Sequence, residues 1–292
     1  MEPSFTQPAE VPATKAKALL ERHGLRAKKG LGQHFLVDAR VLRRIVAAAD
    51  LTTEDTVVEV GPGLGILTRE LAQRAGRVLA VEADSEMVRI LSEIASQYTN
   101  LTVIHGDILQ IDPVSLLPAT SGTRFDYKVV ANLPYYITSA VLRHFLEASR
   151  RPTLMVVMLQ REVGQAIVAG PGDMSMLAVS VQFYGKPSIV ARVPARSFYP
   201  PPKVDSVVLR IDVYGKPPVE VPSTQALFDT ARAGFSAPRK QLRNSLAQGL
   251  GMTGEEAAGL LRRAGIDPRR RAETLSIEEW GSLCRERSRL EP

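Results

Sequence analysis

Short apolar segments alternate with amphipathic segments along most of the chain. Runs rich in Val, Ile and Leu predict buried strands, and the stretches between them repeat apolar residues at helical spacing. The expected strands cover residues 56–60, 77–82, 101–105, 128–131, 153–159, 188–193 and 206–213. The expected helices cover residues 38–49, 64–74, 85–96, 139–148, 161–168 and 174–183. This alternation predicts βαβ units and a mostly parallel sheet.

The pattern changes near the Gly-Lys-Pro-Pro sequence at residues 215–218. No strand pattern follows. Helical periodicity instead occupies residues 224–235, 239–248, 254–264 and 276–287. We therefore expect a sheet domain over residues 15–214 and a small all-helical domain over residues 215–292. Residues 1–14 contain three prolines and few large apolar side chains, which predicts a disordered tail.

The composition indicates a globular protein with an acidic partner. Of the 292 residues, 45% are hydrophobic and 23% charged, which allows a sizeable core. The formal net charge of +6 and the pI of about 9.5 favour nucleic acid as the partner. The single cysteine, Cys284, cannot form an internal disulfide, and we find neither a secretory signal nor a membrane-spanning run. We therefore expect a cytoplasmic protein without membrane association.

The tetrapeptide Asn132-Leu133-Pro134-Tyr135 follows an apolar strand. The side-chain oxygen of Asn132 can accept a hydrogen bond from an exocyclic N–H, and Pro134 stiffens the turn. The ring of Tyr135 offers a stacking face for a planar base. Taken alone, the tetrapeptide is equally well explained as a strand followed by a proline turn.

A glycine-rich turn, G-x-G-x-G, follows the first strand of the sheet. Gly61 and Gly63 allow a ligand to approach the backbone closely, and the turn leaves free N–H groups at the start of a helix. Glu59 precedes the turn by two residues. This combination suits a nucleoside cofactor with a cationic amino-acid tail better than a pyrophosphate, although a tight turn without a ligand gives the same pattern.

Two carboxylates end the next two strands. Glu82 lies about 20 positions after Gly61, where a carboxylate can accept hydrogen bonds from both ribose hydroxyls. Asp107 can accept from an adenine amino group. The plainer alternatives are an exposed strand-end acid for Glu82 and an Asx turn for Asp107. Because the carboxyl ends of parallel strands share one edge of a sheet, four such groups favour a ligand site.

These motifs, taken in order, resemble the class I S-adenosylmethionine-dependent methyltransferases, and N-L-P-Y resembles their N6-adenine group in particular. Longer markers are GLGQHFLVD at residues 30–38, SFYPPPKVDS at 197–206 and GFSAPRKQLRNSL at 234–246. Together they resemble the small-subunit ribosomal RNA adenine dimethyltransferase family, known as KsgA or RsmA, over about residues 15–285. The resemblance implies an α/β fold with a Rossmann-like sheet domain and a smaller all-helical C-terminal domain.

The resemblance also implies an activity. The enzyme would transfer methyl groups from S-adenosylmethionine to N6 of two adjacent adenines near the 3′ end of 16S rRNA, in the small subunit or its precursor. The implied cofactor contacts are His34, Leu36, Gly61, Glu82, Asp107 and Asn132, to which the glycine-rich turn adds Glu59 and Gly63. Many bacterial members have Asn in place of His34, so no role is implied for its side chain. We expect no metal and a monomeric enzyme.

The predicted mechanism is one of orientation, because the lone pair of adenine N6 is delocalised into the ring. Asn132 Oδ1 and the backbone carbonyl of Leu133 are expected to accept the two N6 hydrogens and to aim the lone pair at the methyl group. Tyr135 is expected to stack on the flipped base, with Phe235 or Phe198 on the opposite face. Packing within a helical core explains Phe235 equally well.

Basic residues cluster in three places, each of which is either an RNA-contacting surface or an ordinary solvated face. Residues 15–34 carry six Lys or Arg against the single acid Glu21. The second cluster is Arg239, Lys240 and Arg243, of which positions 239 and 243 are expected on one helix face. The third is the arginine triplet at 269–271, for which a solvated turn is the favoured interpretation.

Three alternative functions fit parts of the sequence. A 23S rRNA adenine methyltransferase of the macrolide-resistance type shares N-L-P-Y, but K-V-D-S at 203–206 and R-K-x-L-R-N-S-L argue against it. A DNA N6-adenine methyltransferase usually carries D/N-P-P-Y. A non-catalytic assembly factor is disfavoured by the intact Gly61, Glu82, Asp107 and N-L-P-Y, although an added assembly role stays open.

Overall fold

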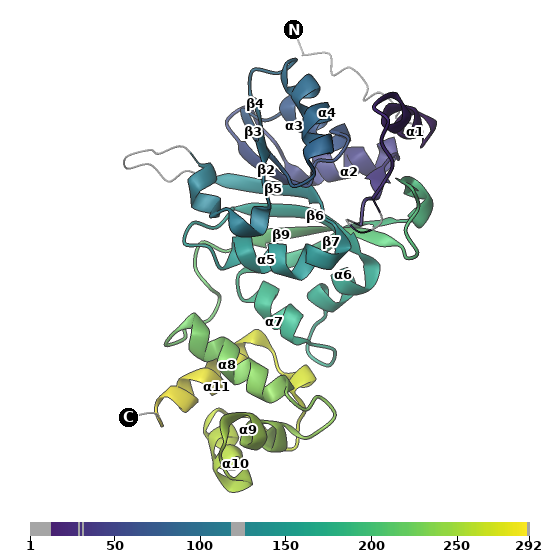
Figure 1. Ribbon diagram of the computed structural model, residues 1–292. Coiled ribbons are helices and arrows are strands. Elements are labelled where there is room, and N and C mark those ends of the chain that lie inside the picture. Colours follow the sequence, from purple (N-terminus) through teal and green to yellow (C-terminus); the bar gives the residue numbers. More distant parts are fainter. Residues whose placement is uncertain (1–12, 29, 31, 118–125, 291–292) are drawn as a thin grey trace. The chain divides into compact units, whose positions relative to one another are not determined.

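The computed structural model describes residues 13–28, 30, 32–117 and 126–290 (Figure 1). The predicted N-terminal tail lies outside these residues, except for its last two positions, which begin a helix. The chain forms two compact units. The first contains residues up to 164 together with 188–213, and the second contains residues 165–187 together with those from 214 onward. Segment 165–187 therefore lies with the C-terminal helices, although its sequence shows no break from the sheet domain.

A seven-stranded sheet organises the first unit, in the order β4-β3-β2-β5-β6-β9-β7. Its strands are β2 (Thr56–Val60), β3 (Arg77–Glu82), β4 (Leu101–His105), β5 (Tyr127–Asn132), β6 (Leu154–Gln160), β7 (Gly185–Val193) and β9 (Ser206–Val213). Strands β4, β3, β2, β5 and β6 are parallel, and β9 runs antiparallel to β6. The expected mostly parallel sheet is confirmed.

A separate two-stranded antiparallel pair joins β1 (Phe35–Leu36) to β8 (Phe198–Tyr199). The sequence did not predict these strands, because two residues are too few to show a periodicity. Their pairing carries residues 32–36 to the edge of the sheet, where a cavity opens at the strand ends.

The helices of the first unit include α1 (Ala13–Arg22), α2 (Ala39–Ala49), α3 (Ile66–Ala72), α4 (Ser85–Ala95) and α5 (Thr138–Leu146). The predicted cap of α2 is confirmed, since Asp38 Oδ1 accepts from the backbone N–H groups of Arg40 and Val41. Buried side chains of α2, α3 and α4 form one hydrophobic cluster with alternate residues of the strands, including Val57 and Val130. This packing fixes the strand ends on which the site is built.

The second unit is mainly helical. It contains α7 (Met176–Gln182), α8 (Thr224–Phe235), α9 (Leu242–Leu250), α10 (Gly254–Arg263) and α11 (Ile277–Ser288), while α6 (Arg161–Val168) crosses its boundary. Its core surrounds the fully buried Trp280, whose ring leaves no room for a side chain at Gly234. Within the described residues, no helix is both long and apolar enough to cross a bilayer.

Candidate active site at the carboxyl ends of the parallel strands

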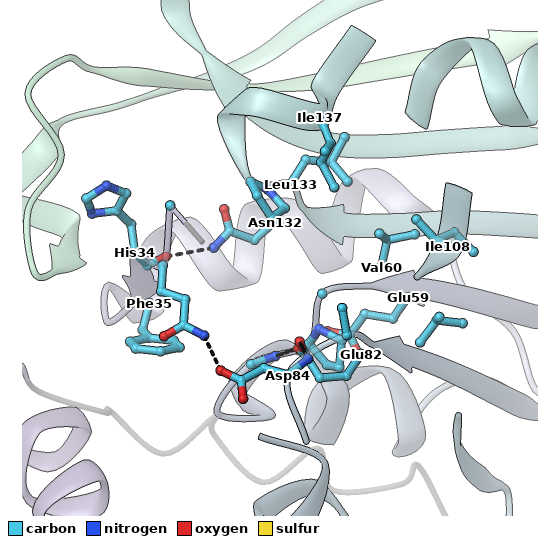
Figure 2. A pocket seen from close by; sticks show the side chains of 18 of the residues that line it. His34, Phe35, Glu59, Val60, Glu82, Asp84, Ile108, Asn132, Leu133 and Ile137 are labelled. Atoms are coloured by element: carbon cyan, nitrogen blue, oxygen red, sulfur yellow. Dashed lines mark hydrogen bonds between the residues drawn. The ribbon is translucent and has the colours of Figure 1, made fainter. Parts of the chain in front are cut away.

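A cavity of about 350 Å³ lies at the carboxyl ends of β2, β3, β4 and β5 (Figure 2). Its lining comes from residues 32–36, 59–64, 66–67, 81–84, 106–108 and 132–137. From β2 the chain runs outward through β3 to β4, and β5 lies on the other side of β2. The cavity therefore occupies the point where the strand order reverses, which is where open α/β sheets bind ligands.

The structure brings together nearly all the residues expected to hold a cofactor or a base. Those that line the cavity are His34, Leu36, Glu59, Gly61, Gly63, Glu82, Asp107, Asn132, Leu133, Pro134 and Tyr135. Their individual roles stay predictions, but their convergence on one cavity is a property of the fold.

The glycine-rich turn has a backbone that ordinary residues rarely adopt. Gly61, Gly63 and Gly65 have φ angles of 64°, 57° and 70°. A β-carbon on Gly63 would lie 3.0 Å from the ring of Phe35, and one on Gly65 would overlap the side chain of Ile94. Glycine at positions 63 and 65 therefore lets the turn pack closely against Phe35 and Ile94.

Glu82 is held from both sides by backbone N–H groups. Gly63 N donates to Oε2 at 3.0 Å, and Asp84 N donates to Oε1 at 2.9 Å. Burial raises the pKa of this carboxyl above its ordinary value, while the two N–H donors oppose the rise. An ionised carboxylate has about four acceptor positions, so two donors leave room for two hydroxyl groups.

Glu59 is the most deeply buried acid of the site, with 1% of its surface exposed. Its Oε2 atom has no hydrogen-bond partner among the described residues. Burial raises the pKa of Glu59 to about 8; the hydroxyl of Thr68 opposes this rise, and the nearby carboxylate of Glu82 adds to it. A buried carboxyl on a cavity wall, with one oxygen left unpartnered, suits a ligand group that donates hydrogen bonds or carries positive charge.

Asp107 forms the Asx turn that was the plainer of its two interpretations. Its Oδ1 accepts from Leu109 N at 3.0 Å and so caps the short 3-10 helix η2 (Ile108–Gln110). The same residue lines the cavity. The Asx turn is thus real, and it fixes the carboxylate at the rim rather than excluding a ligand.

Asn132 ends β5, and its side-chain orientation is set by one contact. Nδ2 donates to the backbone carbonyl of His34 at 3.0 Å. A carbonyl oxygen can only accept, so the amide nitrogen faces His34 and Oδ1 is the atom left for the cavity. Leu133 N donates to Met158 O at 3.1 Å, which fixes the following peptide.

The ring of Tyr135 is fixed by two neighbours. Its hydroxyl lies 2.7 Å from Ser206 Oγ, and its ring stacks against the imidazole of His34 with centroids 5.9 Å apart and planes at 26°. His34 Nδ1 lies 2.7 Å from the carbonyl of Pro200 and must be the donor there. The side chain of His34 therefore supports an aromatic ring of the site.

Of the two phenylalanines proposed for the opposite stacking face, Phe198 does not line the cavity, and Phe235 belongs to the other compact unit. Phe198 is 3% exposed and belongs to the hydrophobic core. Phe235 lies in the second unit, where its ring packs on Trp280 with centroids 5.4 Å apart, so the core-packing interpretation describes it. Tyr136, which the sequence interpretation did not single out, lines the cavity with 65% of its surface exposed.

The basic clusters differ in exposure and in ion pairing. Arg239, Lys240 and Arg243 are exposed, but α9 begins at Leu242. The expectation that positions 239 and 243 share a helix face is therefore wrong, because Arg239 precedes the helix in a turn. Within the arginine triplet, each residue has an acidic partner: Arg269 pairs with Asp267, Arg270 with Glu279 and Arg271 with Glu273.

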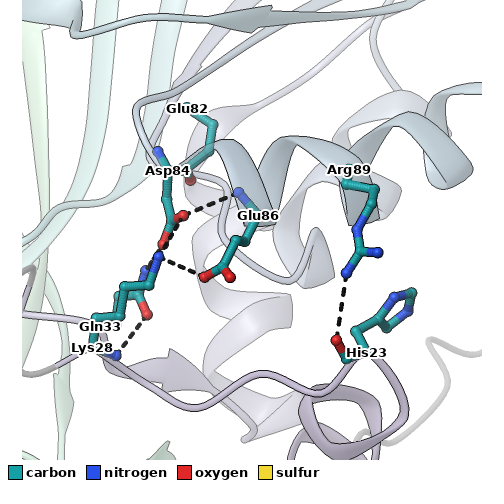
Figure 3. A network of polar contacts seen from close by, with 7 residues as sticks. All are labelled: His23, Lys28, Gln33, Glu82, Asp84, Glu86 and Arg89. Atoms are coloured by element: carbon teal, nitrogen blue, oxygen red, sulfur yellow. Dashed lines mark hydrogen bonds and ion pairs between the residues drawn. The ribbon is translucent and has the colours of Figure 1, made fainter.

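The N-terminal basic segment is partly structural as well. Lys28 Nζ lies 2.9 Å from Asp84 and 2.6 Å from Glu86 (Figure 3). Asp84 also accepts a hydrogen bond from Gln33. Gln33 and Asp84 line the cavity and were missed by sequence reasoning, although Asp84 follows Glu82 by only two residues. Lys29 lies outside the described residues.

Comparison with known proteins assigns the family. Residues 24–287 match the family model of the ribosomal RNA adenine dimethylases. The chain belongs to this family. Its relatives include the ribosomal RNA small subunit methyltransferase A of Dehalococcoides mccartyi, 54% identical over 92% of this chain and 91% of that protein. The protein of the same name from Moorella thermoacetica is 44% identical over 92% of this chain and 95% of its own length.

Solved structures support the fold. A dimethyladenosine transferase from Plasmodium falciparum aligns with a TM-score of 0.71 and 24% identity, over 86% of this chain and 96% of that one. The 23S rRNA methyltransferase ErmE aligns with a TM-score of 0.69 and 28% identity, over 86% and 98%. This adenine dimethylase therefore has the class I methyltransferase fold that its sequence predicted.

Proposed function

We propose that this chain dimethylates N6 of two adjacent adenines near the 3′ end of 16S rRNA, in the small ribosomal subunit or its precursor. Membership of its family makes the chain an S-adenosylmethionine-dependent rRNA adenine methyltransferase. Relatives that are 44% and 54% identical are named for the small subunit, whereas ErmE, named for 23S rRNA, is 28% identical. This difference supports the small-subunit substrate. We expect a monomer acting in the cytoplasm, where ribosomes are assembled.

The cavity fits S-adenosylmethionine. Its volume of about 350 Å³ lies within the range of small-molecule sites. Glu82, already held by two N–H donors, would take the ribose hydroxyls. Glu59, with its unpartnered oxygen, and the turn at Gly61 and Gly63 would hold the amino-acid part. Asp107 would accept a hydrogen bond from the amino group of the cofactor's adenine.

Two further segments complete the proposed cofactor site. His34 and Leu36, from the N-terminal part of the chain, would line one wall of it, and Asn132 would lie between the cofactor and the target base. When bound, the cofactor supplies an electrophilic methyl group. The protein's own residues then have to present a weak nucleophile to it.

The orientation of Asn132 carries the proposed mechanism. Because Nδ2 is bound to the His34 carbonyl, Oδ1 and the Leu133 carbonyl can accept the two N6–H groups of a flipped adenine. This arrangement favours a lone pair on N6 that points out of the ring plane, and it stabilises the positive charge that develops on that nitrogen. The proton then leaves to solvent. After one methylation a single N–H remains, so one acceptor and a rotation about C6–N6 suffice for the second.

Tyr135 would provide the stacking surface for the flipped base. The hydrogen bond to Ser206 and the ring of His34 hold its aromatic plane before the base arrives, which lowers the ordering cost. Arg239, Lys240 and Arg243 are the exposed candidates for phosphate contacts.

The experiment that tests this function uses tritiated S-adenosylmethionine and purified ribosomal subunits that lack the modification. We expect label in small subunits only, recovered as N6,N6-dimethyladenosine after digestion to nucleosides. Label in large subunits, or a monomethylated product alone, would contradict the proposal. Asn132→Ala serves as the matched control, because it removes the acceptor and leaves the cofactor carboxylates in place.

A further inference from the structure

We infer that Gln33, held by Asp84, is a positioning residue that keeps the oxygen of Asn132 turned toward the target adenine. The inference rests on the proposed function, since it concerns how Asn132 is prepared for that reaction. Neither Gln33 nor Asp84 has a role in the cofactor and base contacts that the sequence motifs imply.

The carboxamide of Asn132 has two chemically opposite ends. Its oxygen accepts hydrogen bonds and its nitrogen donates them, and rotation about χ2 exchanges the two with little torsional cost. With the nitrogen turned inward, two donors would meet at adenine N6. The only interaction found to select the productive end is the 3.0 Å bond from Nδ2 to the His34 carbonyl, within the described chain.

The His34 carbonyl lies in a stretch with little regular structure of its own. Residues 33 and 34 precede β1, a strand of only two residues. Gln33 anchors this stretch through its side chain. Nε2 donates to Asp84 Oδ2 at 2.9 Å, and Oε1 accepts from Lys28 N at 2.9 Å (Figure 3). Gln33, which is the covalent neighbour of His34, is thus held at both the nitrogen and the oxygen of its side-chain amide.

Asp84 is well suited to hold Gln33, because its own position is fixed. Its side chain is 3% exposed, and Oδ1 accepts from Lys28 Nζ and from Glu86 N at 2.9 and 3.1 Å. Its backbone N–H donates to Glu82 Oε1. Asp84 therefore belongs to the same rigid turn as the carboxylate that faces the cofactor side of the cavity.

These contacts form one continuous path along the cavity, whose residues are labelled in Figure 3 from Glu82 to Gln33 and in Figure 2 at His34 and Asn132. It runs from Glu82 to the Asp84 N–H, from the Asp84 carboxylate to Gln33, through the Gln33–His34 peptide, and from the His34 carbonyl to Asn132. Glu82 and Asn132 end β3 and β5, which are separated in the sheet by β2. The path links the cofactor side of the site to the base side without passing through the sheet.

The test variant is Gln33→Met, which keeps the length of the side chain and removes both hydrogen bonds. We expect the single-turnover rate on small subunits, at saturating cofactor, to fall by about tenfold or more, since a small misplacement of a reacting group is costly. The Kd for S-adenosylmethionine, measured by calorimetry, should change by less than about threefold. Glu86→Gln is the matched control, because it alters an exposed partner of Lys28 and leaves the Gln33–Asp84 bond intact.

Two further readouts separate positioning from a merely structural role. In the cofactor-free protein, the side-chain NH₂ protons of Asn132 should exchange faster with solvent in Gln33→Met than in the wild type, as followed by NMR. In an Asn132→Ala background, Gln33→Met should slow the reaction by no more than about twofold, because a residue that acts through Asn132 has nothing left to position. If Gln33→Met does not fold, Gln33→Glu, which sets a carboxylate against Asp84, takes its place.

The inference is overturned if Gln33→Met reacts within about twofold of the wild type, or if it slows the Asn132→Ala enzyme by the same factor as the wild type. Unchanged exchange of the Asn132 amide also contradicts it. Failure of the proposed function looks different, because wild-type protein would then leave small subunits unmodified.

Discussion

At the scale of the residue, the site depends on polar groups whose partners are few and specific. Glu82 and Asn132 are each fixed by backbone groups, while Glu59 keeps an oxygen without a partner among the described residues. The sequence indicated these three residues because each lies at or next to the carboxyl end of a predicted strand. Gln33 and Asp84 were not indicated, because their importance comes from contacts between segments about 50 residues apart, which no local pattern encodes.

Asn132→Ala removes the acceptor while leaving the acids of the cofactor side unchanged. We expect turnover to fall by about 10²-fold or more, by analogy with the loss of one group that stabilises a transition state. Cofactor affinity, measured by calorimetry, should stay close to that of the wild type. Turnover near the wild-type value would refute the orientation mechanism.

Glu82→Ala should have the opposite profile. It removes a carboxylate whose charge-assisted bonds to hydroxyls contribute about 1.5–3 kcal/mol each, so the Kd for S-adenosylmethionine should rise by at least about tenfold. Calorimetry with S-adenosylhomocysteine provides a second measurement on the same site. An unchanged affinity for both ligands would remove Glu82 from the cofactor site.

Glu59→Gln should change how stability depends on pH. Burial raises the pKa of Glu59 in the folded protein to about 8, from an ordinary value of 4.5. Below pH 4.5 the group is protonated in both states and imposes no penalty. Between these two values the unfolded chain releases the proton while the folded protein keeps it, so the wild type progressively loses stability.

The variant has no such titration. Its free energy of unfolding should therefore rise relative to that of the wild type as the pH rises through this window. The difference between the two proteins should grow by about 1.4 kcal/mol per pH unit and reach a few kcal/mol. Urea denaturation of the cofactor-free proteins at about pH 5 and about pH 8 measures the difference. Parallel behaviour of the two proteins would show that Glu59 titrates normally.

At the scale of the element, hydrophobic periodicity predicted the strands of the main sheet well, but it predicted helix α3 and the short strands β1 and β8 poorly. Strands β2, β3, β4 and β9 have the predicted bounds, because an apolar run flanked by polar residues marks a buried strand clearly. Helix α3 is shorter than expected, since Gly63 and Gly65 adopt a left-handed backbone before it begins. Strands β1 and β8 have two residues each and form by pairing with each other, so neither could be predicted alone.

The turn before α3 gives a prediction at this scale. Gly65→Ala combines a left-handed φ of 70° with overlap between the new methyl group and Ile94. We expect a loss of about 2 kcal/mol or more and a melting temperature lower by about 4 °C or more. Gly254→Ala is the control, because a β-carbon there meets open space at the first turn of α10. Equal melting temperatures for the two variants would contradict this account.

At the scale of the whole molecule, the net charge of +6 correctly indicated a nucleic-acid substrate but did not locate the contact surface. Several basic residues that looked available, such as Lys28 and Arg270, are engaged in ion pairs. Sequence alone could not distinguish them from the exposed group at Arg239, Lys240 and Arg243, because the acidic partners of Lys28 and Arg270 lie further along the chain.

Changing Arg239, Lys240 and Arg243 together to Gln should weaken binding to small subunits and leave cofactor affinity intact. The slope of log K against log salt should flatten by roughly 0.7–0.9 for each phosphate group that the protein no longer neutralises. Arg269→Gln serves as the control, because Arg269 is already paired with Asp267. A slope unchanged by the triple substitution would direct attention to the basic N-terminal segment.

The central claim is that this enzyme places two methyl groups on each of two adjacent adenines near the 3′ end of 16S rRNA. Primer extension tests it most directly, since N6,N6-dimethyladenine cannot pair normally and stops reverse transcription. We predict two adjacent stops near the 3′ end that require both S-adenosylmethionine and Asn132, when small subunits are sampled before modification is complete, so that a stop at the first adenine does not hide the second. Stops in 23S rRNA, a single isolated stop, or the same two stops with Asn132→Ala at the wild-type rate would contradict the account.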